Sequence, residues 1–475
     1  MSAGPSADES GAYGFESAGH RRALGVWSLL ALGVNGIVGV GIFFTPNLVA
    51  RLLPGTPGVW AYALTMLALL PVAITYARLG SRFDRDGGPY VWACAAFGSG
   101  AGFVVGFAAY ASAVLSTSAV LAGLGEYTAP VLGFGGHKQA FSLLAALLFA
   151  AVVAAGLKPS AWLWSSLTLL KLLPLLLLVA LFLIAGSSEP TPTATAPSAP
   201  AASWSRAVLL IVFSMQGFEI VPVPGSHVRS AERAIPIATI GSLLSCAGLY
   251  MLLHWTCVRS VVSLASSDAP LVAAAGALGG ARLTELVSAG TNVSVIGIVF
   301  GMMAMTPRYL AALETLTGTM ANSAPQTPQQ VPRRALLVTL VSVLILLSWG
   351  PLSRLFVLSS VAVLFQYSVS VCSLAVLALK RAHGLSPRDA ASAPLALVAL
   401  AVVAHAVERA ELLVMSGIVV PGGSWGIPVG MPGIPVGIPG IPPGRALGTA
   451  PGSPPAAGIR APPGRPPLRP LGLAC

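Results

Sequence analysis

Long apolar runs, separated by short polar connections, recur along the chain up to about residue 420. A helix needs roughly 20 apolar residues to cross about 30 Å of hydrocarbon. Eleven runs approach or exceed that length, near 24–50, 58–79, 89–121, 139–157, 161–185, 204–226, 236–258, 286–308, 335–353, 355–379 and 393–420. The pattern predicts an all-α polytopic membrane protein.

The first run contains a sequence that a continuous helix would not favour. The twenty-eight residues from Ala23 to Ala50 carry no charge, but the middle reads Gly36-Ile37-Val38-Gly39-Val40-Gly41. Glycine costs roughly 1 kcal/mol relative to alanine inside a helix. A break here frees backbone amides and carbonyls within the bilayer, which is tolerated where they face a ligand or ion. We therefore expect a broken helix that binds something.

The sixth run is interrupted in a similar way. Gly217, Pro222, Pro224 and Gly225 break an apolar stretch that also holds Glu219. This run comes first after a Pro-, Thr- and Ala-rich connection at 186–203, as the glycine-rich run comes first before it. Interrupted helices at corresponding places in two halves indicate inverted repeats with a central site. Half-helix ends present amides to an anion and carbonyls to a cation, which suits the two charges of an amino acid.

Composition supports the membrane assignment. The chain is 55% hydrophobic and 9% charged, with a mean hydropathy of +0.82, which excludes a single soluble globular domain. If the N-terminus is cytoplasmic, fourteen Arg and Lys residues lie in the connections on the cytoplasmic side. The outer connections hold far fewer, chiefly five. This bias predicts a cytoplasmic N-terminus. The net charge of +11 thus reflects topology, and no arginine-aromatic cluster indicates nucleic acid.

The same pattern divides the chain into segments. We expect a cytoplasmic N-terminal segment at 1–23 without a cleaved signal, a first repeat of five helices at 24–185 and a second at 204–380. A final helix at 393–420 precedes a tail at 421–475 in which 28 of 55 residues are Pro or Gly, so the tail is expected to be disordered. The five cysteines have no metal-binding spacing, and we expect no metal or cofactor.

Four motifs in order resemble the amino acid/polyamine/organocation permease superfamily. They are GIVGVGIF at 36–43, GGPY at 87–90 with AFGSGAGFVVGF at 96–107, FSMQGFE at 213–219, and LSSVAVLFQY at 358–367. The resemblance covers roughly residues 20 to 400. It implies 11 to 12 transmembrane helices in a five-plus-five inverted repeat (a LeuT-like fold) with helices 1 and 6 broken. It also implies that Gly36, Ile37, Val38, Gly39, Val40 and Gly41 receive a substrate carboxylate, opposite Phe213, Met215, Gln216 and Gly217.

The chain departs from the family pattern in two places. After the sixth run the family usually has an acidic residue, a basic residue and Asn-Pro, whereas this chain has His227-Val228-Arg229-Ser230-Ala231 before Ile235-Pro236. The cytoplasmic gate is therefore expected to be altered. The Pro- and Gly-rich tail replaces the twelfth helix, which lies outside the repeat.

Lys171 and Glu219 are the candidates for proton coupling. Lys171 lies about ten residues, or roughly 15 Å, from either end of its run. An ionisable residue at this depth is a functional hypothesis by default. Some superfamily members place a lysine here where sodium-coupled relatives bind a cation, which implies a proton-coupled carrier. The alternatives are a lysine permanently paired with backbone carbonyls, and a glutamate that bonds freed amides or a substrate ammonium.

The sequence thus predicts a permease for amino acids in the plasma (inner) membrane, working by proton-coupled symport and alternating access. An exchanger of an amino acid for its amine, and a non-transporting amino acid sensor, remain as alternatives. An enzyme is disfavoured because the chain has no HExxH or Walker A motif. The expected partners are a small amino acid or amine, protons and the lipid bilayer. The oligomeric state and the particular substrate stay open.

Overall fold

The computed structural model describes residues 24–83, 87–155, 161–186, 201–225, 228–316, 333–349, 352–405 and 407. All of them belong to the compact unit Met1–Pro421. Within these ranges the regular structure is helical, apart from one isolated parallel bridge between Leu24 and Val228. The segment expected at 1–23 and the tail expected at 421–475 lie outside the described residues.

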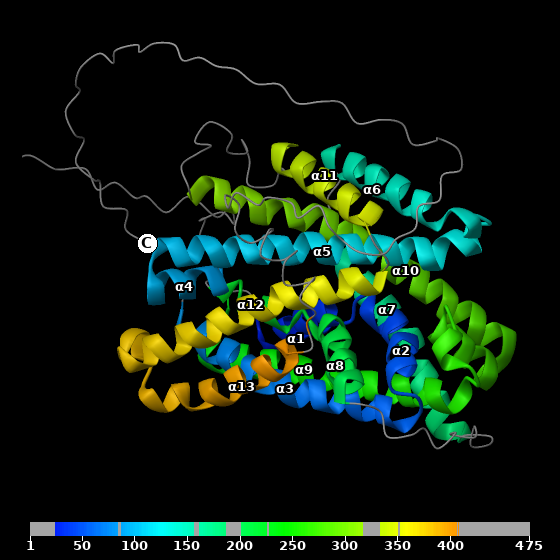
Figure 1. Ribbon diagram of the computed structural model, residues 1–475, viewed down its shortest axis with the longest axis horizontal. Helices are drawn as coiled ribbons and strands as arrows, with labels where there is room; N and C mark the ends of the chain where they lie inside the picture. Colours follow the sequence, from blue (N-terminus) through cyan, green and yellow to red (C-terminus); the bar gives the residue numbers. More distant parts are fainter. Residues whose placement is uncertain are drawn as a thin grey trace, which may run out of the picture. The chain divides into compact units, whose positions relative to one another are not determined.

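The helices follow the predicted apolar runs in order (Figure 1). The α-helices are α1 Val26–Ile37, α2 Gly41–Leu52, α3 Thr56–Arg82, α4 Pro89–Phe97, α5 Ser99–Val131, α6 Lys138–Ala154, α7 Ala161–Ala185, α8 Ala201–Met215, α9 Ala231–Ser260, α10 Pro270–Leu316, α11 Arg333–Trp349, α12 Leu352–Leu379 and α13 Ala393–Ala404. Short 3-10 helices are η1 Gly135–His137, η2 Phe218–Ile220, η4 Leu264–Ser266, η5 Ala382–Gly384 and η6 Pro387–Ser392.

Many of these helices are long and apolar enough to cross a membrane. Among the described residues seven helical segments meet that criterion, and α1 with α2 makes an eighth if the pair is one span bent by 48°. Shorter apolar helices occupy Leu170–Ile184 and Ser203–Met215. Side chains such as Leu337, Val341 and Ile345 on α11 are more than half exposed, as a lipid-facing surface requires. The chain is an all-α, multi-pass membrane protein.

Two predicted runs have different boundaries in the structure. The run expected at 89–121 is two helices, because Gly98 takes a φ of +93° that ends α4 before α5 begins. α5 then continues to Val131. The run expected at 286–308 is part of α10, which starts at Pro270 and contains a non-helical Gly280 with φ of 64°. In both cases a glycine supplies a backbone conformation that side chains disfavour.

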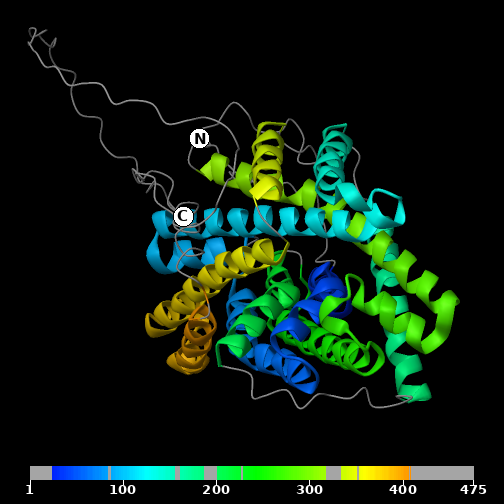
Figure 2. The ribbon, with the colours of Figure 1, turned by 45° about the vertical axis from the view of Figure 1, so that its right-hand side comes forward.

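The helices pack in two groups (Figures 1 and 2). α9 packs against α1 and α3, whereas α5 packs against α6, α10, α11 and α12. α8 contacts α2 and α3 and also α12. The segment that follows α8 includes η2, which contacts α1, α3 and α9.

Candidate functional site

The first predicted break is present and is narrower than the glycine pattern indicates. α1 ends at Ile37, α2 starts at Gly41, and Val38 to Val40 are not helical. Val38 and Val40 are nearly completely buried. Gly36 and Gly41 were expected to be unwound. Instead, Gly36 lies in the last turn of α1 and Gly41 is the first residue of α2.

The second predicted break is also present. α8 ends at Met215, Gly217 has a φ of +127°, and Val221 to Pro224 form turns after η2. Only glycine adopts such a φ without strain. Beyond the break, Val228 pairs with Leu24, and the Arg229 N–H donates to the Leu24 carbonyl over 2.9 Å. The altered gate sequence thus contacts the start of α1, while His227 lies outside the described residues.

The two breaks touch each other through their backbones. A methyl group added at Gly217 would lie 2.3 Å from the carbonyl carbon of Gly36 and 2.5 Å from the amide nitrogen of Ile37. No side chain fits in that space. Gly36 and Gly217 are therefore required for close approach of the two segments.

Lys171 from α7 reaches the first break. Its Nζ donates to the carbonyl oxygens of Asn35 and Val38, over 2.9 Å and 2.6 Å. The residue is 3% exposed. The C-terminal end of a helix carries a partial negative charge, so these carbonyl oxygens are a natural site for an ammonium group.

Tyr250 from α9 reaches the same break. Its hydroxyl group donates to the carbonyl oxygen of Ile37 over 2.8 Å. Side chains from α7 and α9 thus satisfy three carbonyl oxygens at the end of α1. The sequence analysis identified Lys171 but missed Tyr250, because an isolated tyrosine in an apolar run gives no signal of its partner.

Glu219 lies at the second break and accepts a hydrogen bond from another residue of that break. One carboxylate oxygen, Oε2, accepts from the N–H of Gly217 over 2.7 Å and from the hydroxyl of Tyr367 over 3.0 Å. Of the alternatives weighed for this residue, the structure has the one in which it bonds an amide freed by the break. Tyr367 belongs to the motif at 358–367, so the sequence marked its segment without giving its role.

The N-terminal end of α2 faces the break without a side-chain cap. Val40, in the N-cap position, makes no side-chain hydrogen bond, and the first amides of a helix have no partner within it. A methyl group added at Gly39 would meet only the Ile37 carbonyl oxygen, at 3.7 Å. By contrast, Gly41 is packed tightly against Ser214. Gly39 is the open position of the predicted glycine set.

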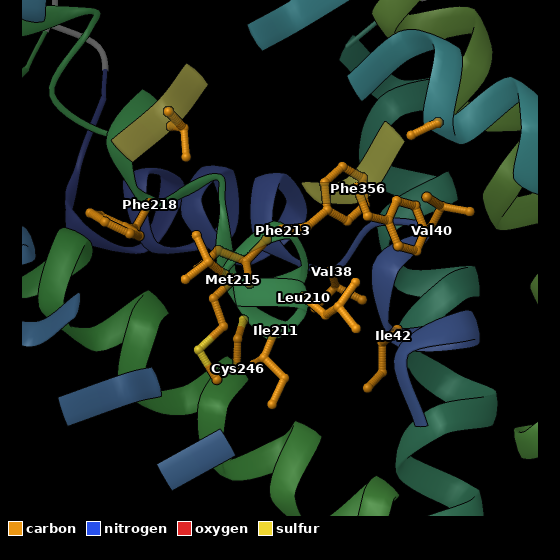
Figure 3. Packing of buried hydrophobic residues seen from close by; sticks show 14 of the residues in the cluster. Val38, Val40, Ile42, Leu210, Ile211, Phe213, Met215, Phe218, Cys246 and Phe356 are labelled. Carbon is orange, nitrogen blue, oxygen red and sulfur yellow. The ribbon is translucent and has the colours of Figure 1, made fainter. Parts of the chain in front are cut away.

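The residues of the α8 segment that were predicted to line the substrate site contact different helices. Phe213 stacks on Phe356 of α12, with ring centroids 4.1 Å apart (Figure 3). Met215 is fully buried and lies near Cys246 of α9. Gln216 accepts a hydrogen bond from Ser359 of α12 over 3.3 Å. Of this set, Gly217 contacts the end of α1 at the first break, Phe213 and Gln216 contact α12, and Met215 packs toward α9.

Known proteins similar to this chain are transporters. A Bacillus subtilis serine/threonine exchanger, SteT, is 24% identical over 63% of this chain and 69% of its own length. An uncharacterized transporter of Mycobacterium tuberculosis is 28% identical over 76% of this chain and 81% of its own length. The branched-chain amino acid permease BcaP of Lactococcus lactis is 27% identical over 62% of this chain and 68% of its own length.

The family assignment covers most of the chain. The profile of one family, described as amino acid permease, matches residues 24–428, which include both breaks and Lys171. Its members and the similar proteins are transporters rather than enzymes. This chain belongs to the amino acid permease family.

Proposed function

We propose that this protein is a secondary active transporter that carries an amino acid together with protons by alternating access. The observation that supports it most is the contact of Lys171 with the carbonyl oxygens of Asn35 and Val38. A lysine at this depth can hold the break when charged and release it after losing its proton. The state of the first break would then depend on one proton.

The substrate site is proposed to lie where the two breaks meet. The uncapped amides at the start of α2 suit the substrate carboxylate, because a helix N-terminus attracts an anion. The substrate carboxylate can approach the backbone closely at Gly39, because the α-carbon of Gly39 faces open space. Phe213 and Gln216 line the side opposite the break, and Gly36, Gly41 and Gly217 allow the segments to pack.

Glu219 is proposed to hold the second break and to be the second site of proton coupling. A proton on Oε2 would weaken its acceptance of the hydrogen bonds from Gly217 and Tyr367. Protonation would therefore loosen the segment after α8. This role is separate from that of Lys171, which acts on the first break.

The topology is proposed to be the five-plus-five repeat. The first repeat contains α1 with α2, then α3, α5, α6 and α7, and the second contains α8 with η2, then α9, α10, α11 and α12. Each repeat begins with a broken segment, which supports the assignment. The bias of basic residues supports a cytoplasmic N-terminus in a plasma membrane protein.

Exchange is the second candidate function. The relative SteT is named as a serine/threonine exchanger, and its similarity extends over 63% of this chain. Exchange uses the same site but requires a substrate on both sides. Counterflow into vesicles preloaded with amino acid, without a pH gradient, distinguishes it from symport.

The proposed function is tested in proteoliposomes with an imposed pH gradient. Wild-type protein is expected to accumulate amino acid only with the gradient, and Lys171→Gln is expected to abolish this proton-driven uptake. Lys380→Gln is the matched control, because Lys380 also donates to a backbone carbonyl, that of Ala96 over 3.3 Å, but away from the breaks. Unchanged gradient dependence in Lys171→Gln would contradict the coupling role.

A further inference from the structure

Gln216 is a half-buried residue whose amide nitrogen is buried and does not donate a hydrogen bond. Its Oε1 accepts a hydrogen bond from Ser359, whereas its Nε2 is buried and has no partner among the described residues. An N–H group buried without an acceptor costs free energy that the native state avoids elsewhere. The Nε2 donor therefore has no acceptor among the described residues.

The oxygen atom of this amide faces α12 and α5. The Ser359 hydroxyl group that binds Oε1 also pairs with the Ser116 hydroxyl of α5, over 2.7 Å. Oε1 is thus directed to α12 and α5. Because the two polar atoms of an amide project from the same carbon in different directions, Nε2 is directed away from this pair of serines.

A second glutamine has its amide donor satisfied within the protein. Gln366 on α12 is 6% exposed, and its Nε2 donates to the hydroxyl group of Tyr76 over 3.2 Å. The more deeply buried glutamine thus has its donor satisfied by the protein. At Gln216 the acceptor is missing.

Gln216 lies at the junction of the two breaks. Three residues earlier on α8, Phe213 stacks on Phe356, and one residue later Gly217 touches Gly36. Phe356 also contacts Phe44 of α2, with ring centroids 6.4 Å apart. Gln216 is thus flanked in the chain by Phe213, which packs on an aromatic pair, and by Gly217, which contacts the end of α1.

We propose that Gln216 determines substrate specificity by donating from Nε2 to an oxygen atom of the substrate side chain. The substrate class is neutral amino acids whose side chains carry a hydroxyl or carboxamide oxygen. Apolar side chains of the same shape leave the donor unmet and are disfavoured. This inference rests on the proposed transport of amino acids through the same site.

Two pairs of nearly equal shape test the assignment: threonine against valine, and asparagine against leucine. Uptake of each by wild-type protein in proteoliposomes gives a ratio of kcat/KM. We expect the oxygen-bearing member to be preferred by about tenfold or more. In Gln216→Met, which keeps the length but removes the amide, the ratio is expected to fall to about one or below.

Ser359→Ala is the companion variant, because it frees Oε1 and lets the amide group rotate. It is expected to give an intermediate ratio. Wild-type protein that carries both members of each pair equally, or a Gln216→Met variant that keeps the full preference, overturns the assignment. If Gln216→Met does not fold, thermal shifts of wild-type protein decide: larger stabilisation by threonine than by valine supports the assignment, and equal stabilisation overturns it.

The outcomes also distinguish this assignment from the transport proposal. Equal uptake of the paired amino acids, with gradient dependence still lost in Lys171→Gln, rejects only the role of Gln216. Absence of uptake or counterflow of every amino acid by wild-type protein rejects the transport proposal itself.

Discussion

The backbone groups freed at the two breaks have different hydrogen-bond partners. At the first break, carbonyl oxygens at the end of α1 accept hydrogen bonds from Lys171 and Tyr250, which belong to helices far along the chain. At the second break, Glu219 accepts from Gly217, only two residues away, and from Tyr367. The first break is therefore held by side chains from other helices, whereas the second is held partly by one of its own residues.

The backbone differs as well. The first break needs no positive φ, whereas the second depends on Gly217 at +127°. The second break is thus fixed by a local conformation that only glycine adopts readily. This contrast indicates that the first break is the adjustable one, and the following substitutions test it.

Gly217→Ala should have the largest effect. It combines a strained φ with a methyl group 2.3 Å from the Gly36 carbonyl carbon, so we expect little folded, monodisperse protein after extraction. Size-exclusion chromatography of a fluorescent fusion measures this. Gly98→Ala is the control, because Gly98 has a φ of +93° but no atom within 4 Å of the added methyl. A folded Gly217→Ala variant would show that the two breaks are not closely packed.

Glu219→Leu should have the next largest effect. Loss of the acceptor leaves the Gly217 N–H and the Tyr367 hydroxyl without this partner, which costs about 1–3 kcal/mol each where buried. We expect a lower melting temperature in a thermal-shift assay and little transport. Glu219→Gln keeps an oxygen acceptor and should fold.

The same pair of variants separates the two roles of Glu219. If Glu219→Gln transports but loses its dependence on pH, the carboxyl group couples protons. A wild-type pH profile in Glu219→Gln would leave Glu219 as a structural residue of the second break only.

Gly39→Ala should have the smallest effect on folding. The added methyl would meet only the Ile37 carbonyl oxygen at 3.7 Å, so we expect a change in stability of less than about 0.5 kcal/mol. The methyl instead occupies the approach to the α2 amides, and KM should rise about tenfold or more. Gly248→Ala in α9, which also has open space around it, should leave KM unchanged. An unaltered KM in Gly39→Ala would place the substrate carboxylate elsewhere.

Much of the fold could be predicted because its signals are local. Apolar runs fixed the order of the spans, and glycine and proline within two of them marked the breaks. Boundaries were less predictable: Gly98 divides one expected run, since a single positive φ ends a helix without changing hydropathy. The motif at 358–367 marked Tyr367 and Ser359 as a group, but their partners could not be inferred from it.

The sequence by itself determined that this protein is a multi-pass helical membrane protein with two interrupted spans and one deeply buried lysine. Each of these properties follows from residues close together in the chain. Only the tertiary structure decided what meets at the interruptions. Lys171 is 136 residues from Asn35 and Tyr250 is 213 residues from Ile37, so packing of helices, rather than spacing in the sequence, joins them. The physical reason is that a freed carbonyl oxygen in the bilayer must find a donor, and it accepts whichever one the surrounding helices bring within reach.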